Sequence, residues 1–233
     1  MELFRRIFLA AVLAGAVAGL GLATVQQWRV VPLILEAETY EIAAHSRDGA
    51  VVETTPHNDE VEVWAPAGGI ERTAYTALAT ILAGLGFALV TAAVSTLTGL
   101  MVTVRNGVIW GLGGFLAFSM APAFGLPPEL PGMPAGDIAL RQLWWWGTVI
   151  ASGAGILVIA RLRNWAGIGI GVVLIAIPHL IGAPAAPEEH SDVPAHLASA
   201  YAASALAASM IFWLILGPLM GKLNERFGAL EAA

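Results

Sequence analysis

Three side chains of types that commonly bind metal ions share one face of a short predicted helix. Glu38, Glu41 and His45 follow one another at spacings of three and four residues, which brings them to the same side of an α-helix. Pro32 is well suited to the start of such a helix. Two carboxylates and one imidazole suit a divalent metal ion of intermediate hardness, such as cobalt, nickel, zinc or manganese. The alternative is a solvated amphipathic helix on the membrane surface that binds no ion.

Glu129 and His179 are further candidate ligands in separate parts of the chain. Glu129 lies among four prolines in the segment GLPPELPGMPAGDIALRQ, and these prolines stiffen the backbone around it. A carboxylate held so rigidly could line a pore entrance, whereas the competing interpretation is a structural ion pair with Arg141. His179 lies in the apolar run that ends IPHLIGAP, where a polar side chain is a functional candidate. It could ligate a metal ion, a haem or a chlorin, or it could hydrogen-bond a neighbouring helix.

Two other segments add carboxylates and histidines without a recognisable motif. Residues 183–195 contain three acids, one histidine and no basic residue, which makes this loop a second candidate for collecting cations. Residues 51–55 and 60–64 predict a β-hairpin whose turn holds His57 and Asp59. Exposed turn residues usually have no binding role, so we assign none to this pair.

The elements that must position these side chains are membrane spans. The chain is 58% hydrophobic and 12% charged, and a helix of about 20 apolar residues crosses a bilayer core of roughly 30 Å. Six runs without Asp, Glu, Lys or Arg predict an all-α integral membrane protein with a single membrane domain, residues 1–233. The first run could also be a secretory signal, but it exceeds the usual length and lacks a convincing cleavage site. The spans are about 7–25, 73–98, 107–125, 143–160, 165–182 and 197–219, and the extracytoplasmic loop 26–72 holds the predicted short helix and hairpin.

The basic residues set the predicted orientation of these spans. Positive charge collects in short cytoplasmic loops, and seven of the eleven basic residues lie inside when both termini are cytoplasmic. The acids play no part in this rule, yet three lie inside and fourteen outside. The outer surface is therefore acidic and would attract cations. The seven inner basic residues are Arg5, Arg6, Arg105, Arg161, Arg163, Lys222 and Arg226.

Small residues predict where the spans pack against one another. In lipid, apolar burial gives little drive for association, so close contacts depend on glycine and alanine stripes. The first span has Gly15 and Gly19 four residues apart, beside a stripe formed by Ala10, Ala14 and Ala18. The fifth has Gly167 and Gly171 at the same spacing. We interpret these stripes as ordinary helix contacts.

Composition and missing motifs exclude several classes of protein. The chain has no cysteine, so it forms no disulfide, thiolate metal site or iron–sulfur cluster. It has no P-loop, no GxSxG elbow and no HExxH helix, and we therefore predict that it is not an enzyme. Its net charge of −6 makes it a poor binder of nucleic acid.

Six segments of the chain form a recognisable set: PLILEAETYE after the first span, WAPAGGIERTAYT before the second, GVIWGLGGF, APAFGLPPELPG, RQLWWW and PHLIGAP. Together they resemble the CbtA family of predicted cobalt transporter subunits, and the resemblance covers nearly the whole chain. It implies a subunit for cobalt uptake in the bacterial inner membrane, linked to cobalamin metabolism, with a small single-span partner, CbtB, that has a histidine motif. Such families are often described with five spans, whereas six are counted here.

Two functional hypotheses follow. In the first, outer carboxylates concentrate a divalent cation, the Glu38–His45 helix or Glu129 holds it near the entrance, and His179 offers a ligand just inside. The transported ion is cobalt or another divalent cation, because these donors also suit nickel, and no tightly bound cofactor is predicted. In the second, the chain is an accessory or structural subunit of a larger membrane complex, in which His179 ligates a pigment or haem. Membrane lipid is a partner in both.

Overall fold

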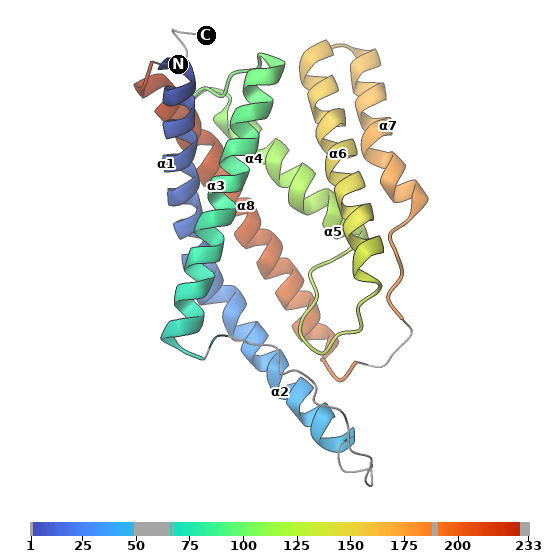
Figure 1. Cartoon of the computed structure of the whole chain (residues 1–233). Coiled ribbons are helices and arrows are strands. Elements are labelled where there is room, and N and C mark those ends of the chain that lie inside the picture. The colour runs from blue at the N-terminus through green and yellow to red at the C-terminus, as the bar shows by residue number, and fades with distance from the viewer. Residues whose placement is uncertain (1, 49–65, 67, 188–190, 229–233) are drawn as a thin grey trace.

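The secondary structure is helical throughout the part of the chain that the structure describes, which is residues 2–48, 66, 68–187 and 191–228 of a computed structural model (Figure 1). The predicted hairpin at 51–64 lies outside these residues. The helices are α1 (Glu2–Val25), α2 (Val31–Asp48), α3 (Ile70–Thr98), α4 (Gly107–Phe115), α5 (Ala121–Gly125), α6 (Ile138–Leu162), α7 (Trp165–Ile181) and α8 (Ala195–Arg226). Two π-helical turns, η1 (Gln26–Val30) and η2 (Leu116–Met120), join α1 to α2 and α4 to α5.

Five of these helical stretches are long and apolar enough to cross a membrane: Glu2–Ala43, Ile70–Thr98, Gly107–Gly125, Ile138–Leu162 and Ala195–Arg226. The fifth predicted span corresponds to α7, which has only 17 residues. At about 1.5 Å per residue it reaches about 25 Å, less than a bilayer core of about 30 Å. The chain is thus a multi-pass membrane protein with five long apolar helices and one short one among the described residues.

Two prolines explain the π-helical turns. Pro32 and Pro122 are each the second residue after a π turn, so both turns have the same register relative to proline. A proline inside a helix donates no hydrogen bond, and its ring clashes with the carbonyl four residues earlier. A wider turn relieves that clash, and the Val31 and Ala121 amides donate to carbonyls five residues back, at Gln26 and Leu116. The helix therefore continues past both prolines.

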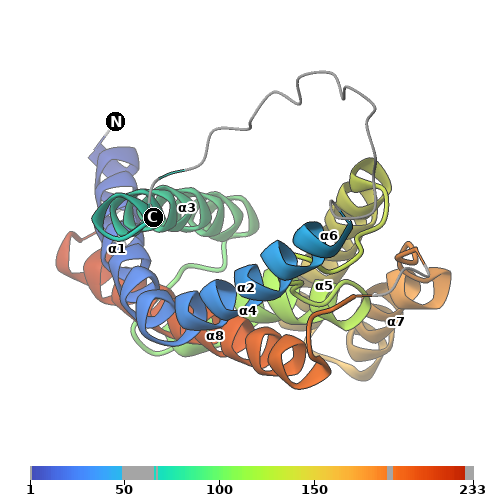
Figure 2. The ribbon, with the colours of Figure 1, turned by 90° about the horizontal axis from the view of Figure 1, so that it is seen from below.

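The segment 26–72, expected as a loop holding a short helix, begins as a direct extension of α1. The chain stays helical from Glu2 to Asp48, which at about 1.5 Å per residue far exceeds the membrane thickness. Pro32 lies within this continuous helix, not at the start of a separate one. Figure 2 shows α2 lying across the end of the bundle, where it contacts α8.

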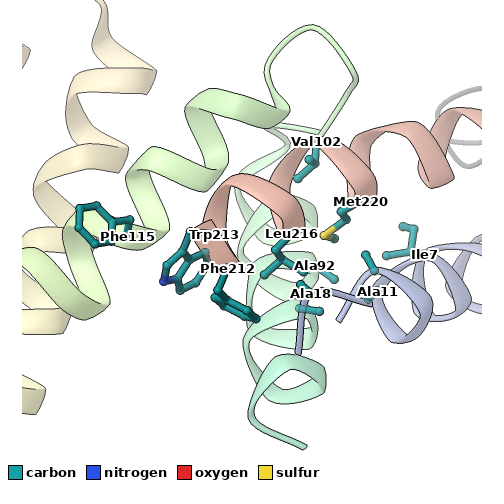
Figure 3. Close-up of a cluster of buried hydrophobic side chains, with 12 residues drawn as sticks. Ile7, Ala11, Ala18, Ala92, Val102, Phe115, Phe212, Trp213, Leu216 and Met220 are labelled. Carbon is teal, nitrogen blue, oxygen red and sulfur yellow. The ribbon is translucent and has the colours of Figure 1, made fainter. Parts of the chain in front are cut away.

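Close backbone contacts hold α1, α3, α4 and α8 together. A side chain on Gly15 would collide with the backbone of Gly84 on α3, and one on Gly107 would collide with Gly217 on α8. The predicted stripe of Ala10, Ala14 and Ala18 on α1 is fully buried. Buried apolar side chains, large and small, form one cluster between these helices. Figure 3 shows Ile7, Ala11, Ala18, Ala92, Val102, Phe115, Phe212, Trp213, Leu216 and Met220.

Helices α6 and α7 form a hairpin that stands on the far side of α4 and α5 from α1 and α3 (Figures 1 and 2). Gly155 and Gly171 face each other across it, because a side chain on either would meet the other's carbonyl oxygen. Asp137 and Asn164 cap the starts of the two helices through side-chain oxygens that accept from the Leu140 and Gly167 amides. The hairpin contacts the rest of the chain mainly through η2 and α5.

The connecting segments separate onto two ends of the bundle (Figure 1). The start of α1, the end of α8, the 99–106 connection and the α6–α7 turn lie at one end, which we call the termini end. Helix α2, the connection 126–137 and residues 183–187 and 191–194 lie at the other, the α2 end. The grouping agrees with the sides deduced from the sequence, and which end faces the cytoplasm stays a prediction. Acids at the α2 end include Glu36, Glu38, Glu41, Glu71, Glu129, Asp137 and Asp192.

The connection 99–106 packs into the termini end. Val102 is fully buried, and its carbonyl accepts a hydrogen bond of 3.1 Å from Asn224 Nδ2 on α8. Ser95 Oγ accepts from the Val102 amide and donates to the Leu100 carbonyl. A side chain on Gly221 would collide with the backbone of Thr103. Side chains of α3 and α8 thus fix the backbone of this connection.

Candidate functional site

A small apolar cluster positions the acidic residues of α2. Four side chains are buried against one another: Ala37 on α2, Leu130 in the 126–137 connection, Val193 just before α8 and Leu197 in its first turn. Burial on this face of α2 fixes which side chains point elsewhere, because helical neighbours one position apart face different ways. Glu38 follows Ala37 directly, and Glu129 precedes Leu130. The cluster therefore brings two predicted ligand segments to one cap at the α2 end.

Glu38 forms a two-pronged ion pair with Arg72 in the first turn of α3. Arg72 Nη2 lies 2.5 Å from Glu38 Oε1, and Nη1 lies 3.2 Å from Oε2. About a third of each side chain is exposed, 32% for Arg72 and 30% for Glu38, so water still reaches the pair. This contact ties α2 to α3 and places a positive charge on a predicted metal ligand.

Glu41 and His45 continue along α2 beyond this pair. Glu41 lies beside Gly132, because a Cβ built on that glycine would be 3.4 Å from the Glu41 Cβ. The Gly132 carbonyl also accepts a hydrogen bond of 3.0 Å from Ser191 Oγ. Glu41 is thus at the junction of α2 with both connections of this end. His45 lies on the α2 backbone one turn further, and its side chain is outside the described part.

Glu129 pairs with Arg141 in the first turn of α6, at 2.5 Å between Oε2 and Nη2. The two side chains are 20% and 26% exposed, so this pair is better shielded from water than the Glu38 pair. The structural ion pair that the sequence offered as the competing interpretation of Glu129 is therefore present. The geometry leaves a role for Glu129 at an entrance open, because the same pair lines a cleft.

The cleft has a volume of about 590 Å³ and lies between η2 with α5, the first turns of α6, and the middle of α8. Polar groups occur at both ends of it. The Glu129–Arg141 pair and Gln142 lie toward the α2 end, and Ser119 and Ser209 lie deeper, joined by a hydrogen bond of 2.6 Å between their hydroxyls. The apolar lining is Phe118, Pro122, Ala123, Leu126, Pro127, Pro128, Ile138, Trp145, Ala205 and Leu206.

His179 lies outside this cleft, on α7 beside aromatic side chains of α5 and α6. Its ring meets Phe124 and Trp144 edge to face, with centroids 5.5 and 5.8 Å apart. The neighbouring residue Pro178 provides a hydrogen bond between α6 and α7, because its backbone carbonyl accepts from Trp144 Nε1 at 3.1 Å. His179 is half-buried. The adjacent Trp145 lines the cleft, so the two sites border different faces of the same turn of α6.

The predicted ligands therefore fall into two groups. Glu38, Glu41 and Glu129 belong to one cap at the α2 end, whereas His179 lies apart from them, beside Phe124 and Trp144. Among the described residues, no three side chains of Asp, Glu or His come close enough to hold one metal ion. The five-residue metal set stays a prediction, and two of its members, Glu38 and Glu129, are each paired with an arginine.

Comparison with known families agrees with this membrane architecture. The family model described as "Probable cobalt transporter subunit (CbtA)" matches residues 4–225. The chain belongs to the CbtA family. The match extends into every described helix and covers the whole cap and cleft. No curated protein and no solved structure matches the chain.

Four polar residues of the cap and cleft in this CbtA chain were not singled out by the sequence: Arg72, Gln142, Ser119 and Ser209. The signal for Arg72 is that it stands on the predicted outer side, where positive charge is depleted, immediately before an apolar span. Arg141 has the same placement. Serines in membrane helices commonly hydrogen-bond the backbone of their own helix, so the sequence gives no sign that Ser119 and Ser209 pair. Their pairing follows from the packing of η2 against α8.

Proposed function

We propose that this CbtA chain is the membrane subunit of a divalent-cation uptake system and that its α2 end is the entrance. The observation that supports this most directly is the cleft of about 590 Å³, which reaches from Glu129 at the acidic end to Ser119 and Ser209 within the bundle. Cobalt is the ion that the family description names. An acidic surface raises the local concentration of cations and speeds their arrival.

The proposed ligands are Glu38, Glu41, His45, Glu129 and His179. Carboxylate and imidazole donors suit cobalt(II) and its neighbours in the first transition row, so the donor set fits the family description without selecting cobalt over nickel. Glu38, Glu41 and Glu129 share the cap and would act at the surface. His179 would act on α7, across α6 from the cleft.

The proposed path needs a partner to complete it. Beyond Ser119 and Ser209, the apolar parts of the described spans offer hydroxyl and backbone groups, with carboxylates again only at Glu2 and Glu225 near their ends, and crossing on such groups alone is unfavourable for a divalent ion. A small single-span subunit with a histidine motif, of the CbtB kind, would supply the missing ligands. In this arrangement the termini end faces the cytoplasm of a bacterium, and the α2 end faces outward.

Cobalt accumulation in cells tests the proposal. Replacing Glu38 and His45 with alanine removes two ligands of different type, and we expect accumulation to fall by about tenfold, as loss of metal-site residues commonly does. Glu36→Ala is the matched control, because Glu36 is an exposed acid on the same helix outside the ligand set. Accumulation is measured by mass spectrometry on washed cells, with the amount of membrane-inserted protein measured alongside. Equal accumulation by the double variant and the control would contradict the proposal.

A second candidate function is that of an accessory subunit in a larger membrane complex. The aromatic surroundings of His179 favour it, because Phe124 and Trp144 could pack against a flat macrocycle ligated by the imidazole. Gentle isolation from native membranes discriminates the two. A coloured multi-subunit assembly without bound cobalt supports the accessory role, whereas a colourless assembly containing cobalt supports uptake.

A further inference from the structure

The mouth of the cleft contains one carboxylate and one guanidinium bound to each other. The Glu129 and Arg141 side chains are 20% and 26% exposed and face no other charged residue in the cleft lining. Their charges cancel, so a cation that arrives at the mouth meets a neutral pair. A divalent ion at Glu129 competes with the arginine for the same negative charge, since Glu129 Oε2 already accepts a hydrogen bond from Arg141 Nη2.

The position of Arg141 in its helix is unfavourable without this partner. It is the fourth residue of α6, and the N-terminal end of a helix has a partial positive charge that repels cations. Arg72, the third residue of α3, is in the same situation and is likewise bound to a carboxylate, Glu38. Both arginines are thus held where the helix alone disfavours them, each against a proposed cation ligand.

We propose that Arg141 is a built-in competitor for the cation site at the cleft mouth, an inference that rests on the proposed function. A divalent cation displaces the guanidinium from Glu129 and binds the freed carboxylate together with the Gln142 side-chain oxygen. When Arg141 returns to Glu129, it releases the ion toward the hydroxyls of Ser119 and Ser209. Competition keeps the affinity moderate, and a transported ion must bind strongly enough to enter and weakly enough to leave.

The chemistry of the mouth supports displacement over permanent pairing. The Arg141 side chain is 26% exposed, so its guanidinium can reach water when it leaves Glu129. Gln142 is exposed beside it on α6 and offers a neutral oxygen. The deeper serines form a pair in which either hydroxyl can donate, so one of them always has a lone pair facing away from the other.

Equilibrium dialysis of the purified full chain against cobalt(II) chloride tests this role. Removing the competitor in Arg141→Gln should tighten cobalt binding by about tenfold, the factor that corresponds to about 1.4 kcal/mol. Glu129→Gln should weaken binding by about tenfold. Arg141→Lys keeps the charge on a compact and more strongly hydrated ammonium group, which competes less well for Glu129, so it should tighten binding by about two- to threefold. Arg105→Gln, which removes an exposed arginine at the termini end, is the charge-matched control and should leave affinity unchanged.

The outcomes separate the two proposals. If the wild-type chain binds cobalt and Glu129→Gln weakens binding, while neither Arg141 variant tightens it, the competitor role is overturned and the proposed function stands. If the wild-type chain binds no cobalt and cells accumulate none through it, both are overturned. Thermal unfolding in the same detergent identifies a folding defect in Arg141→Gln. In that case Arg141→Lys decides, and unchanged or weaker binding by it overturns the competitor role.

Discussion

Trp144 on α6 contacts α7, the helix that contains His179, in two ways. Its indole ring packs edge to face on the imidazole, and its Nε1 donates to the Pro178 carbonyl. That carbonyl also accepts from the Gly182 amide at the end of α7. One side chain of α6 thus both borders the imidazole and fixes the final turn of the helix that bears it.

Replacing Trp144 with phenylalanine should lower stability without removing the apolar contact. The Nε1–Pro178 hydrogen bond is lost, and such a bond contributes about 1 kcal/mol or somewhat less within a membrane protein. Trp146→Phe is the control, because that side chain is 55% exposed. Thermal unfolding followed by intrinsic fluorescence in detergent gives both values. A larger loss of stability in Trp146→Phe than in Trp144→Phe would show that the hydrogen bond is not the cause.

The α6–α7 hairpin depends on two glycines at its centre. A side chain at Gly155 would meet the Gly171 carbonyl and Ile175, so a leucine there should push α7 away and cost about 1–3 kcal/mol, as overpacking does. Gly153→Leu is the matched control in the same helix, because nothing lies within 4 Å of a Cβ at that position. Chemical denaturation in mixed micelles measures both. Equal effects of the two substitutions would mean that helix propensity, not contact with α7, accounts for the loss.

Helix boundaries show what apolar runs predict well and what they do not. Each predicted span corresponds to a helix, because the membrane imposes length and composition directly on the sequence. The continuity of α1 with α2 was not predicted, since Pro32 is equally compatible with starting a helix and with a π turn that absorbs it. The Glu129–Arg141 pair was one of the two interpretations that the sequence offered for Glu129. The Glu38–Arg72 pair was not predicted, because it joins residues 34 positions apart and depends on packing that local spacing does not encode.

The whole molecule is hollowed toward one end and packed at the other. The cleft reaches inward from the α2 end, while Val102 and Asn224 pack the 99–106 connection into the termini end. Inward movement of an ion past Ser119 and Ser209 would therefore require α4 and α8 to shift. Such a shift would break the close backbone contact between Gly107 and Gly217.

The orientation of this asymmetric molecule can be tested directly, because the chain has no cysteine. Single cysteines at Glu71, at the α2 end, and at Arg163, in the α6–α7 turn, are both exposed and lie outside the apolar cores of the spans. The concentration of basic residues at the termini end predicts that this end is cytoplasmic. In intact spheroplasts, a membrane-impermeant maleimide should label the Glu71→Cys variant and leave Arg163→Cys unlabelled until the membrane is permeabilised. The reverse pattern would place the acidic end and its cleft inside the cell, where they would serve export, and would exclude the proposed uptake direction.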